Sequence, residues 1–192
     1  MSGDGAEPPP FDIGFSFDAR LREVPNDTAA MTQAVDWLEA RARAAATPRD
    51  AAHALGMAGA LARMLGEFAR AQRLLEAALA ACPADDEETR RLATVNALRL
   101  AHVFQQRCEY ATADAMFARL IDAVAHEPAL SALRATALQH AGKNAFDQGR
   151  LAAAERQFAE ALALRVAAGQ DDLAESSRHA LAVTRGRLAG RA

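Results

Sequence analysis

Histidine and cysteine are the side chains whose chemistry would be easiest to recognise in this sequence from their spacing. No two histidines form an HxxxH or HExxH motif, and Cys82 and Cys108 form no CxxC motif. Metal sites use such spacings because several ligands must converge on one ion. We therefore expect neither a metal site nor a bound cofactor. The five histidines are His53, His102, His126, His140 and His179.

A cysteine nucleophile would require Cys108 to lie beside His102 or His140. Cys108 occupies a turn position that glycine occupies elsewhere in the chain, which favours a tolerated thiol over an activated one. The sequence also lacks a GxSxG motif, a glycine-rich phosphate loop and a dinucleotide-binding fingerprint. We expect no enzymatic activity.

The densest group of potential oxygen ligands is the acidic run from Asp85 to Glu88. This run directly precedes an apolar-periodic segment. Carboxylates stabilise the first turn of a helix, where N–H groups and the positive end of the helix dipole are exposed. We interpret the run as a helix start and not as a metal site.

The composition favours a helical, single-domain protein. The chain has 192 residues, 51% of them apolar, which is ample for one core, and alanine, the strongest helix former, is abundant while aromatics are only 5%. A net charge of −3 argues against nucleic-acid binding. No segment approaches the ~20 apolar residues of a membrane helix, and no secretory signal precedes the body. With only two cysteines, the simplest expectation is a cytoplasmic protein without a membrane or nucleic-acid partner.

Capping and breaking residues divide the chain into helices. Asp27 or Thr28 can cap the first helix, with Met31, Val35, Leu38 and Ala42 on its apolar face. Thr47 followed by Pro48 marks the start of the next. The expected helices span residues 28–46, 48–65, 67–81, 87–107, 109–126, 128–148, 150–168 and 171–189.

One pattern occurs three times at a nearly constant interval. The turn residues are Gly66, Cys108 and Gly149, and successive turns are separated by about 42 residues, a period typical of stacked helical hairpins. A small residue lies in the helix before each turn and a large apolar residue in the helix after it. The small residues are Gly59, Ala101 and Gly142, and the large ones are Leu75, Phe117 and Phe158.

The pattern resembles the tetratricopeptide repeat family, in its longer-repeat branch typified by kinesin light chains. The first unit matches through Leu55, Gly59, Gly66, Phe68, Ala71, Leu75, Ala78 and Pro83. The second matches through Ala97, Ala101, Cys108, Tyr110, Ala113 and Phe117, and the third through Leu138, Gly142, Gly149, Leu151, Ala154, Phe158 and Ala161. The unit is longer than the ~34 residues of the standard repeat, and only Pro83 keeps the trailing proline.

The resemblance implies an all-α fold, a right-handed α-α superhelix of three helical hairpins. The repeats would span residues 48–83, 86–126 and 128–168, with an N-terminal packing helix at 28–46 and a C-terminal capping helix at 171–189. The lysine and asparagine with which some arrays grip a C-terminal carboxylate correspond here to Gly56 and Ala60. That clamp is therefore absent.

The function implied by the resemblance is non-catalytic binding of a peptide or protein segment in a concave groove lined by the first helix of each hairpin. Lys143 is the only lysine of the chain and is either a groove contact or a solvated helix residue. The candidate groove residues are His53, Arg63, Arg99, His102, Gln105, Gln106, Gln139, His140 and Lys143. A second hypothesis is a ligand- or peptide-responsive regulatory sensor, because longer-repeat arrays include such sensors.

Residues 1–27 form an acidic leader, in which acids outnumber the two basic side chains, Arg20 and Arg22. Within it, Phe11, Ile13, Phe15 and Phe17 alternate with small or acidic residues, a strand-like pattern. We expect a disordered leader. The alternative is an extended segment lying along a groove of its own body or of a second copy, which would make the protein a self-associating scaffold or homodimer.

Overall fold

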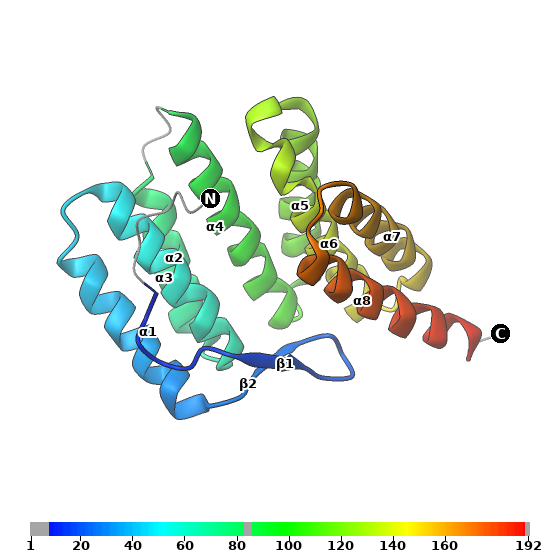
Figure 1. The fold of residues 1–192 in the computed structure, drawn as a ribbon, viewed down its shortest axis with the longest axis horizontal. Helices are drawn as coiled ribbons and strands as arrows, with labels where there is room; N and C mark the ends of the chain where they lie inside the picture. Colours follow the sequence, from blue (N-terminus) through cyan, green and yellow to red (C-terminus); the bar gives the residue numbers. More distant parts are fainter. Residues whose placement is uncertain (1–7, 83–85, 191–192) are drawn as a thin grey trace. The chain divides into compact units, whose positions relative to one another are not determined.

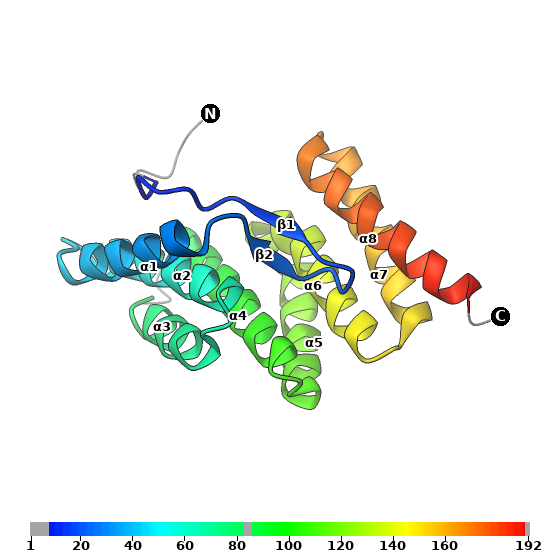
Figure 2. The same cartoon turned by 90° about the horizontal axis from the view of Figure 1, so that it is seen from below.

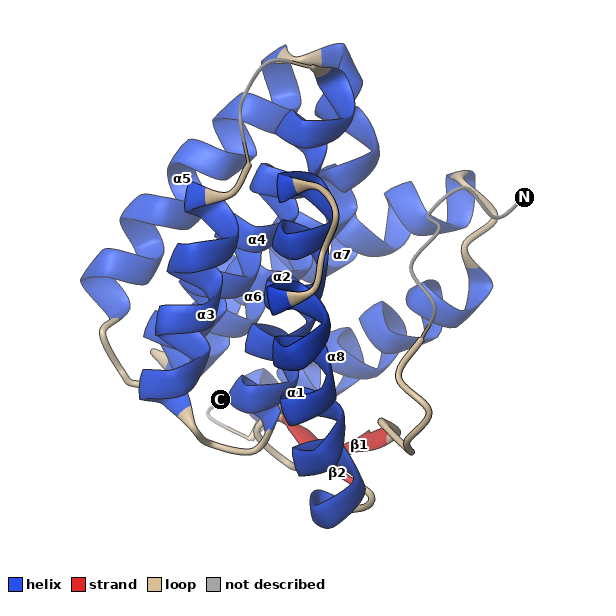
Figure 3. Cartoon of the chain, turned by 90° about the vertical axis from the view of Figure 1, so that its left-hand side faces the viewer, coloured by secondary structure: helices blue, strands red, loops and turns tan. Residues whose placement is uncertain are grey.

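The computed structural model describes residues 8–82 and 86–190, and helices form nearly all of the regular structure in these ranges (Figure 3). The all-α prediction is therefore confirmed. Parts of three predictions lie outside the described residues: the disorder expected over residues 1–7, the trailing proline Pro83 of the first repeat, and the Asp85 end of the acidic run.

The described helices begin and end within about three residues of their predicted boundaries, with one exception. The predicted helix at 128–148 opens as a 3-10 helix, because the Leu130 N–H donates to the Glu127 carbonyl and the Ser131 hydroxyl donates to the Pro128 carbonyl. The elements are β1 (Phe15–Phe17), β2 (Glu23–Pro25), α1 (Thr28–Arg43), α2 (Pro48–Met64), α3 (Phe68–Ala80), α4 (Glu87–Gln106), α5 (Tyr110–His126), η1 (Pro128–Leu133), α6 (Arg134–Asp147), α7 (Leu151–Ala167) and α8 (Asp171–Ala189).

The chain divides into two compact units where the sequence predicted one domain. Unit 1 comprises Met1–Asp18 and Arg22–Val103, and unit 2 comprises Ala19–Leu21 and Phe104–Ala192. The boundary falls inside α4, within the second predicted repeat.

In unit 1, α2 packs against both α1 and α3 (Figure 1). The two predicted helix starts are confirmed. The Ala30 N–H donates to Asp27 Oδ1 at 2.9 Å at the start of α1, and the Asp50 N–H donates to Thr47 Oγ1 at 3.1 Å at the start of α2. Met31, Val35 and Leu38 are buried as predicted.

The close helix contact predicted at the small residues is present in the first and third hairpins. A Cβ atom on Gly59 of α2 would lie 2.6 Å from Leu75 Cγ, and one on Gly142 of α6 would lie 2.6 Å from a ring carbon of Phe158. Real Cβ atoms do not approach other heavy atoms this closely. Glycine at these two positions therefore sets how near the second helix of each hairpin can come.

The three predicted turn residues share one backbone geometry. Gly66, Cys108 and Gly149 have φ of +79°, +64° and +71°, the left-handed region. At each turn, the N–H of the turn residue donates to the carbonyl three residues back, and the next N–H donates to a carbonyl five residues back. This is the Schellman ending of a helix, which needs a left-handed residue and favours glycine. Gly169, between α7 and α8, repeats it with φ of +65°.

The acidic leader is ordered over part of its length, contrary to the expectation of disorder. Strands β1 and β2 pair antiparallel, with Phe15 opposite Pro25 and Phe17 opposite Glu23 (Figure 2). The loop closes because the Asp18 N–H donates to the Arg22 carbonyl, while the Arg22 N–H donates to the Asp18 carboxylate at 2.9 Å. The alternating aromatics therefore indicated a real strand, β1. The turn closed by Asp18 brings β2 back beside it.

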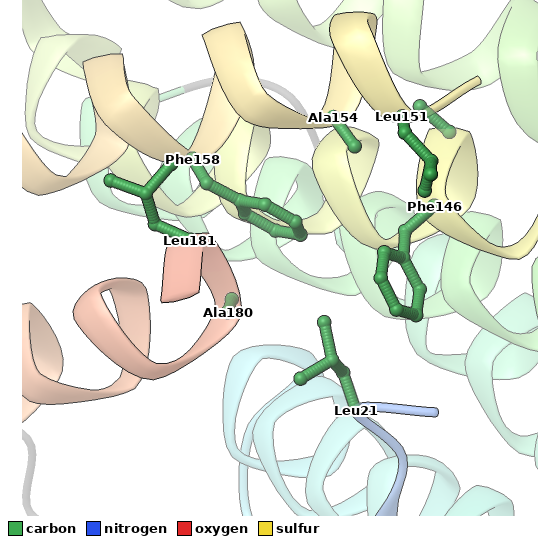
Figure 4. Close-up of a cluster of buried hydrophobic side chains, with 8 residues drawn as sticks. Leu21, Phe146, Leu151, Ala154, Phe158, Ala180 and Leu181 are labelled. Carbon is green, nitrogen blue, oxygen red and sulfur yellow. The ribbon is translucent and has the colours of Figure 1, made fainter. Parts of the chain in front are cut away.

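In unit 2, α6 packs against α7 and α7 against α8, so that the predicted C-terminal helix covers the third hairpin. The apolar cluster of this unit comes from α6, α7, α8 and the residue Leu21 (Figure 4). Leu21 has φ of +61°, is 2% exposed and points toward the Phe146 ring. Phe158 and Phe117 are also buried. The cluster comprises Leu21, Ala145, Phe146, Leu151, Ala154, Phe158, Ala180 and Leu181.

We predict that Cys108→Gly stabilises the protein by about 1 kcal/mol, because an L side chain at positive φ costs about 1–2 kcal/mol that glycine avoids. The weak hydrogen bond from the Tyr110 hydroxyl to Cys108 Sγ, at 3.4 Å and exposed, offsets little of this. Urea unfolding measures the change. Gly149→Cys is the matched reverse substitution and should lose a similar amount. A destabilised Cys108→Gly variant would contradict the shared turn geometry.

Candidate functional site

The predicted site residue Arg63 lies in the last turn of α2 and forms a buried ion pair. Its Nη1 atom is 3.0 Å from Oε2 of Glu23 on β2, and the two side chains are 4% and 7% exposed. The hairpin that the leader forms thus places a carboxylate against α2. Arg63 does not line an open surface in this state of the chain, because Glu23 covers it.

Arg99, from the middle of α4, reaches toward α2 beside this pair. Its Nη1 atom donates to Asn96 Oδ1 at 3.1 Å, and its Nη2 atom donates to the thioether sulfur of Met57 at 3.4 Å. Both acceptors are neutral. Among the described residues, Arg99 therefore donates to no carboxylate, in contrast to Arg63.

The electrostatics of Arg99 reflect this environment. Burial, with a further contribution from the positive charge of Arg63, lowers the pKa of Arg99 to about 10. A lowered pKa of a base means that its surroundings disfavour the charged form. Because this pKa is still well above neutrality, Arg99 remains a cation at physiological pH. We call Glu23, Arg63, Asn96 and Arg99 the arginine cluster.

Space for the arginine cluster comes from a glycine inside α2. A Cβ atom on Gly56 would lie 2.0 Å from Asn96 Oδ1 and 2.9 Å from Arg99 Nη1. Asn96 is completely buried and donates from Nδ2 to the Ala52 carbonyl at 3.4 Å. Glycine in a helix interior costs about 1 kcal/mol relative to alanine. Here that cost accompanies the close approach of the Asn96 amide, which a Cβ atom at position 56 would force to shift.

The other predicted groove residues of unit 1 are histidines with different exposure. His102 is 2% exposed and His53 is half-buried. Neither is a solvated surface residue of the kind expected for an open groove.

In unit 2, the predicted glutamines serve internal hydrogen bonds. Gln105 Nε2 donates to Asp147 Oδ2 at 3.1 Å. Gln139 Oε1 accepts a 2.8 Å hydrogen bond from the Ser177 hydroxyl, and Ser177 Oγ accepts one of 2.7 Å from Arg165 Nη1. Arg165 is buried, and burial lowers its pKa. Gln139, Arg165 and Ser177 thus connect α6, α7 and α8, and Gln105 connects α4 with α6.

The remaining predicted residues of unit 2 are Gln106, His140 and Lys143. Gln106 and Lys143 are buried, with Lys143 only 5% exposed, and His140 is half-buried. Lys143 is therefore not a solvated helix residue, which was one of the two interpretations of the only lysine.

Sequence reasoning missed Glu23, Asn96 and Gly56. Glu23 was counted only as one acid of the leader, and no local signal connects it with Arg63, which lies far along the chain. Gly56 did carry a signal, because an isolated glycine inside a helical pattern usually has a packing or functional reason. Asn96 carried another, as a polar residue within an apolar-periodic helix.

Other places on the described surface offer no comparable chemistry. An open, shallow depression is lined by Gly149, Arg150, Leu151, Ala152, Ala153 and Leu188. Its one charged side chain, Arg150, is already 2.6 Å from the Asp114 carboxylate. Over residues 8–82 and 86–190, no three histidine, cysteine or acidic side chains are grouped so that they could hold a metal ion. None of the helices described is long and apolar enough to cross a membrane.

Comparison with models of protein families gave no match, and comparison with curated proteins gave none either. The arginine cluster is therefore interpreted from its own geometry.

We predict that Gly56→Ala destabilises the protein by about 1–3 kcal/mol, although alanine is the better helix former, because the added methyl overlaps Asn96 Oδ1. Gly186→Ala is the matched control, since a Cβ there meets nothing within 4 Å in α8. The control should gain about 0.5–1 kcal/mol. Chemical denaturation of both variants measures the difference, and equal changes of the same sign would contradict the close approach at Gly56.

Proposed function

We propose that this protein is a non-catalytic interaction module that binds a protein segment, with its helical hairpins arranged as in tetratricopeptide arrays. Two features support the resemblance locally. The helix endings at Gly66, Cys108 and Gly149 repeat one left-handed geometry. In the first and third hairpins, a glycine of the first helix packs against a large apolar side chain of the second. In arrays of this kind the first helix of each hairpin, here α2, α4 and α6, supplies the binding surface.

The observation that carries the proposal is the environment of Arg99. Arg99 is half-buried, and a guanidinium that loses part of its hydration is stabilised when charged or well-oriented acceptors replace that hydration. Arg99 has an amide oxygen and a thioether as acceptors, and a second cation, Arg63, nearby. The free protein therefore holds a positive charge that its own described contacts balance incompletely. A partner that brings an acceptor would balance it.

A second arginine that donates to no carboxylate, Arg165, is buried and has a structural explanation. Arg165 lies in the last turn of α7, where the helix dipole favours a cation, and it donates to the Leu173 carbonyl at 2.9 Å. Arg99 lies several residues before the end of α4, and the acceptors it donates to, Asn96 Oδ1 and the Met57 sulfur, are side-chain atoms. Contacts within the fold therefore account for the position of Arg165 more fully than for that of Arg99.

A second candidate function, self-association through the leader, is favoured by the exposed rings of β1. Phe15 and Phe17 pack edge to face with centroids 5.5 Å apart, yet remain 43% and 37% exposed. Two adjacent exposed rings on a short strand offer an apolar contact to a second copy. A fall in molar mass in solution for the double variant Phe15→Ser, Phe17→Ser would establish this role. An unchanged mass would dismiss it.

We predict that Arg99→Gln abolishes capture of a specific protein partner from native lysate, while Arg91→Gln, an exposed arginine of the same helix, leaves capture unchanged. Stability should change by no more than about 1 kcal/mol, because relief of the half-buried positive charge offsets the hydrogen bond that Asn96 loses. Quantitative mass spectrometry measures capture, and thermal unfolding of both variants gives the control. Equal capture by wild type, Arg99→Gln and Arg91→Gln would contradict the proposed function.

A further inference from the structure

The position of Glu23 indicates what kind of group the arginine cluster accepts. Glu23 lies on an extended strand, and its carboxylate is 3.0 Å from Arg63 Nη1 in a buried ion pair. Guanidinium and carboxylate form strong, charge-assisted hydrogen bonds of defined geometry. One arginine of the cluster, Arg63, is therefore already paired with a carboxylate of its own chain.

The second guanidinium makes the cluster unequal in charge. Glu23 carries one negative charge, whereas Arg63 and Arg99 carry two positive charges on α2 and α4 of the same unit. Arg99 donates to Asn96 and Met57, which are neutral. A ligand with more negative charge than Glu23, or with an acceptor placed nearer Arg99, would interact more favourably with the pair.

We propose that the arginine cluster binds a carboxylate-bearing, extended protein segment, and that β2 with Glu23 occupies part of this site until such a segment displaces it. This inference rests on the proposed function and specifies the partner's chemistry. Glu23 is an internal competitor. The partner's apparent affinity therefore depends on the difference between the binding free energies of its carboxylate and of Glu23 at the two arginines.

The hairpin that carries Glu23 is suited to displacement. Each of its strands has three residues, and a two-stranded hairpin of that length is marginally stable by itself. Leu21, in its connecting loop, has a left-handed backbone that disfavours a leucine side chain. Phe15, Phe17 and Val24 remain substantially exposed. The short strands by themselves therefore hold Glu23 against Arg63 only weakly, whereas the buried side chain of Leu21 opposes displacement.

The test uses the full-length chain and two fluorescein-labelled peptides. The first peptide copies residues 14–27, and the second is the same peptide with the Glu23→Gln change. Fluorescence anisotropy measures binding of each to four proteins: wild type, Glu23→Gln, Glu23→Gln with Arg99→Gln, and the control Glu76→Gln, an exposed acid of α3.

Removing the internal competitor should make the first peptide bind Glu23→Gln about 10-fold tighter than wild type, whereas Glu76→Gln should match wild type. The peptide with the Glu23→Gln change should bind Glu23→Gln about 10-fold more weakly than the first peptide. Adding the Arg99→Gln change to the Glu23→Gln protein should remove most of its gain in affinity for the first peptide. Equal binding of the two peptides, or equal binding by wild type and Glu23→Gln, would overturn the inference. So would tighter binding of a peptide with phosphoserine in place of glutamate, which would indicate a phosphate site.

Hydrogen exchange on the wild-type chain gives a second measurement that does not depend on any variant folding. An excess of the first peptide should speed amide exchange over residues 15–25 and slow it at the amides of α2 and α4 around the cluster. Unchanged exchange over residues 15–25 at saturating peptide would overturn displacement.

The two proposals fail in different ways. If partner capture depends on Arg99 but the two peptides bind equally, the interaction module stands and the carboxylate preference is wrong. If the peptides bind as expected but partner capture ignores Arg99→Gln, the site exists and the proposed function is wrong.

Discussion

Two glycines that lie beneath large side chains set the packing on which both units depend. Gly59 meets Leu75, and Gly142 meets Phe158, at distances that leave no room for even one methyl group. The second helix of each hairpin can therefore come close to the first, and the alanines beside these contacts are completely buried, as Ala71 and Ala154 illustrate. Burial in this protein combines helix proximity with a few large aromatic side chains such as Phe158, which agrees with its alanine-rich, aromatic-poor composition.

Local signals made most of the fold predictable. Capping by Asp27 and Thr47 involves residues three apart, and the helix endings at Gly66 and Gly149 are decided by one backbone angle. The repeat also predicted the turn at Cys108. Cysteine by itself does not indicate a turn, but Cys108 lies one repeat interval from both Gly66 and Gly149. The 3-10 opening after Pro128 was not predictable at this level, because proline is equally acceptable at the first position of an α-helix.

The candidate site was predictable only in part, since its partners are distant in sequence. Arg63 and Arg99 were found by placing polar residues on the first helix of each hairpin, and the structure brings both into the arginine cluster. The same reasoning included Gln105 and Gln139, whose amides instead serve internal hydrogen bonds. A polar residue on such a helix can face a partner or a neighbouring helix. Helical periodicity does not distinguish these outcomes, because both require the same spacing.

The glycine at position 56 has a consequence for how this protein can change over generations. The volume that a side chain would occupy there is filled by the Asn96 amide and the Arg99 guanidinium. A larger residue at position 56 is tolerated only if the polar groups opposite shrink or withdraw. Among proteins descended from one ancestral chain, residues 56, 96 and 99 should therefore vary together. A better helix former than glycine should occur at position 56 only where residues 96 and 99 are no longer these two polar side chains.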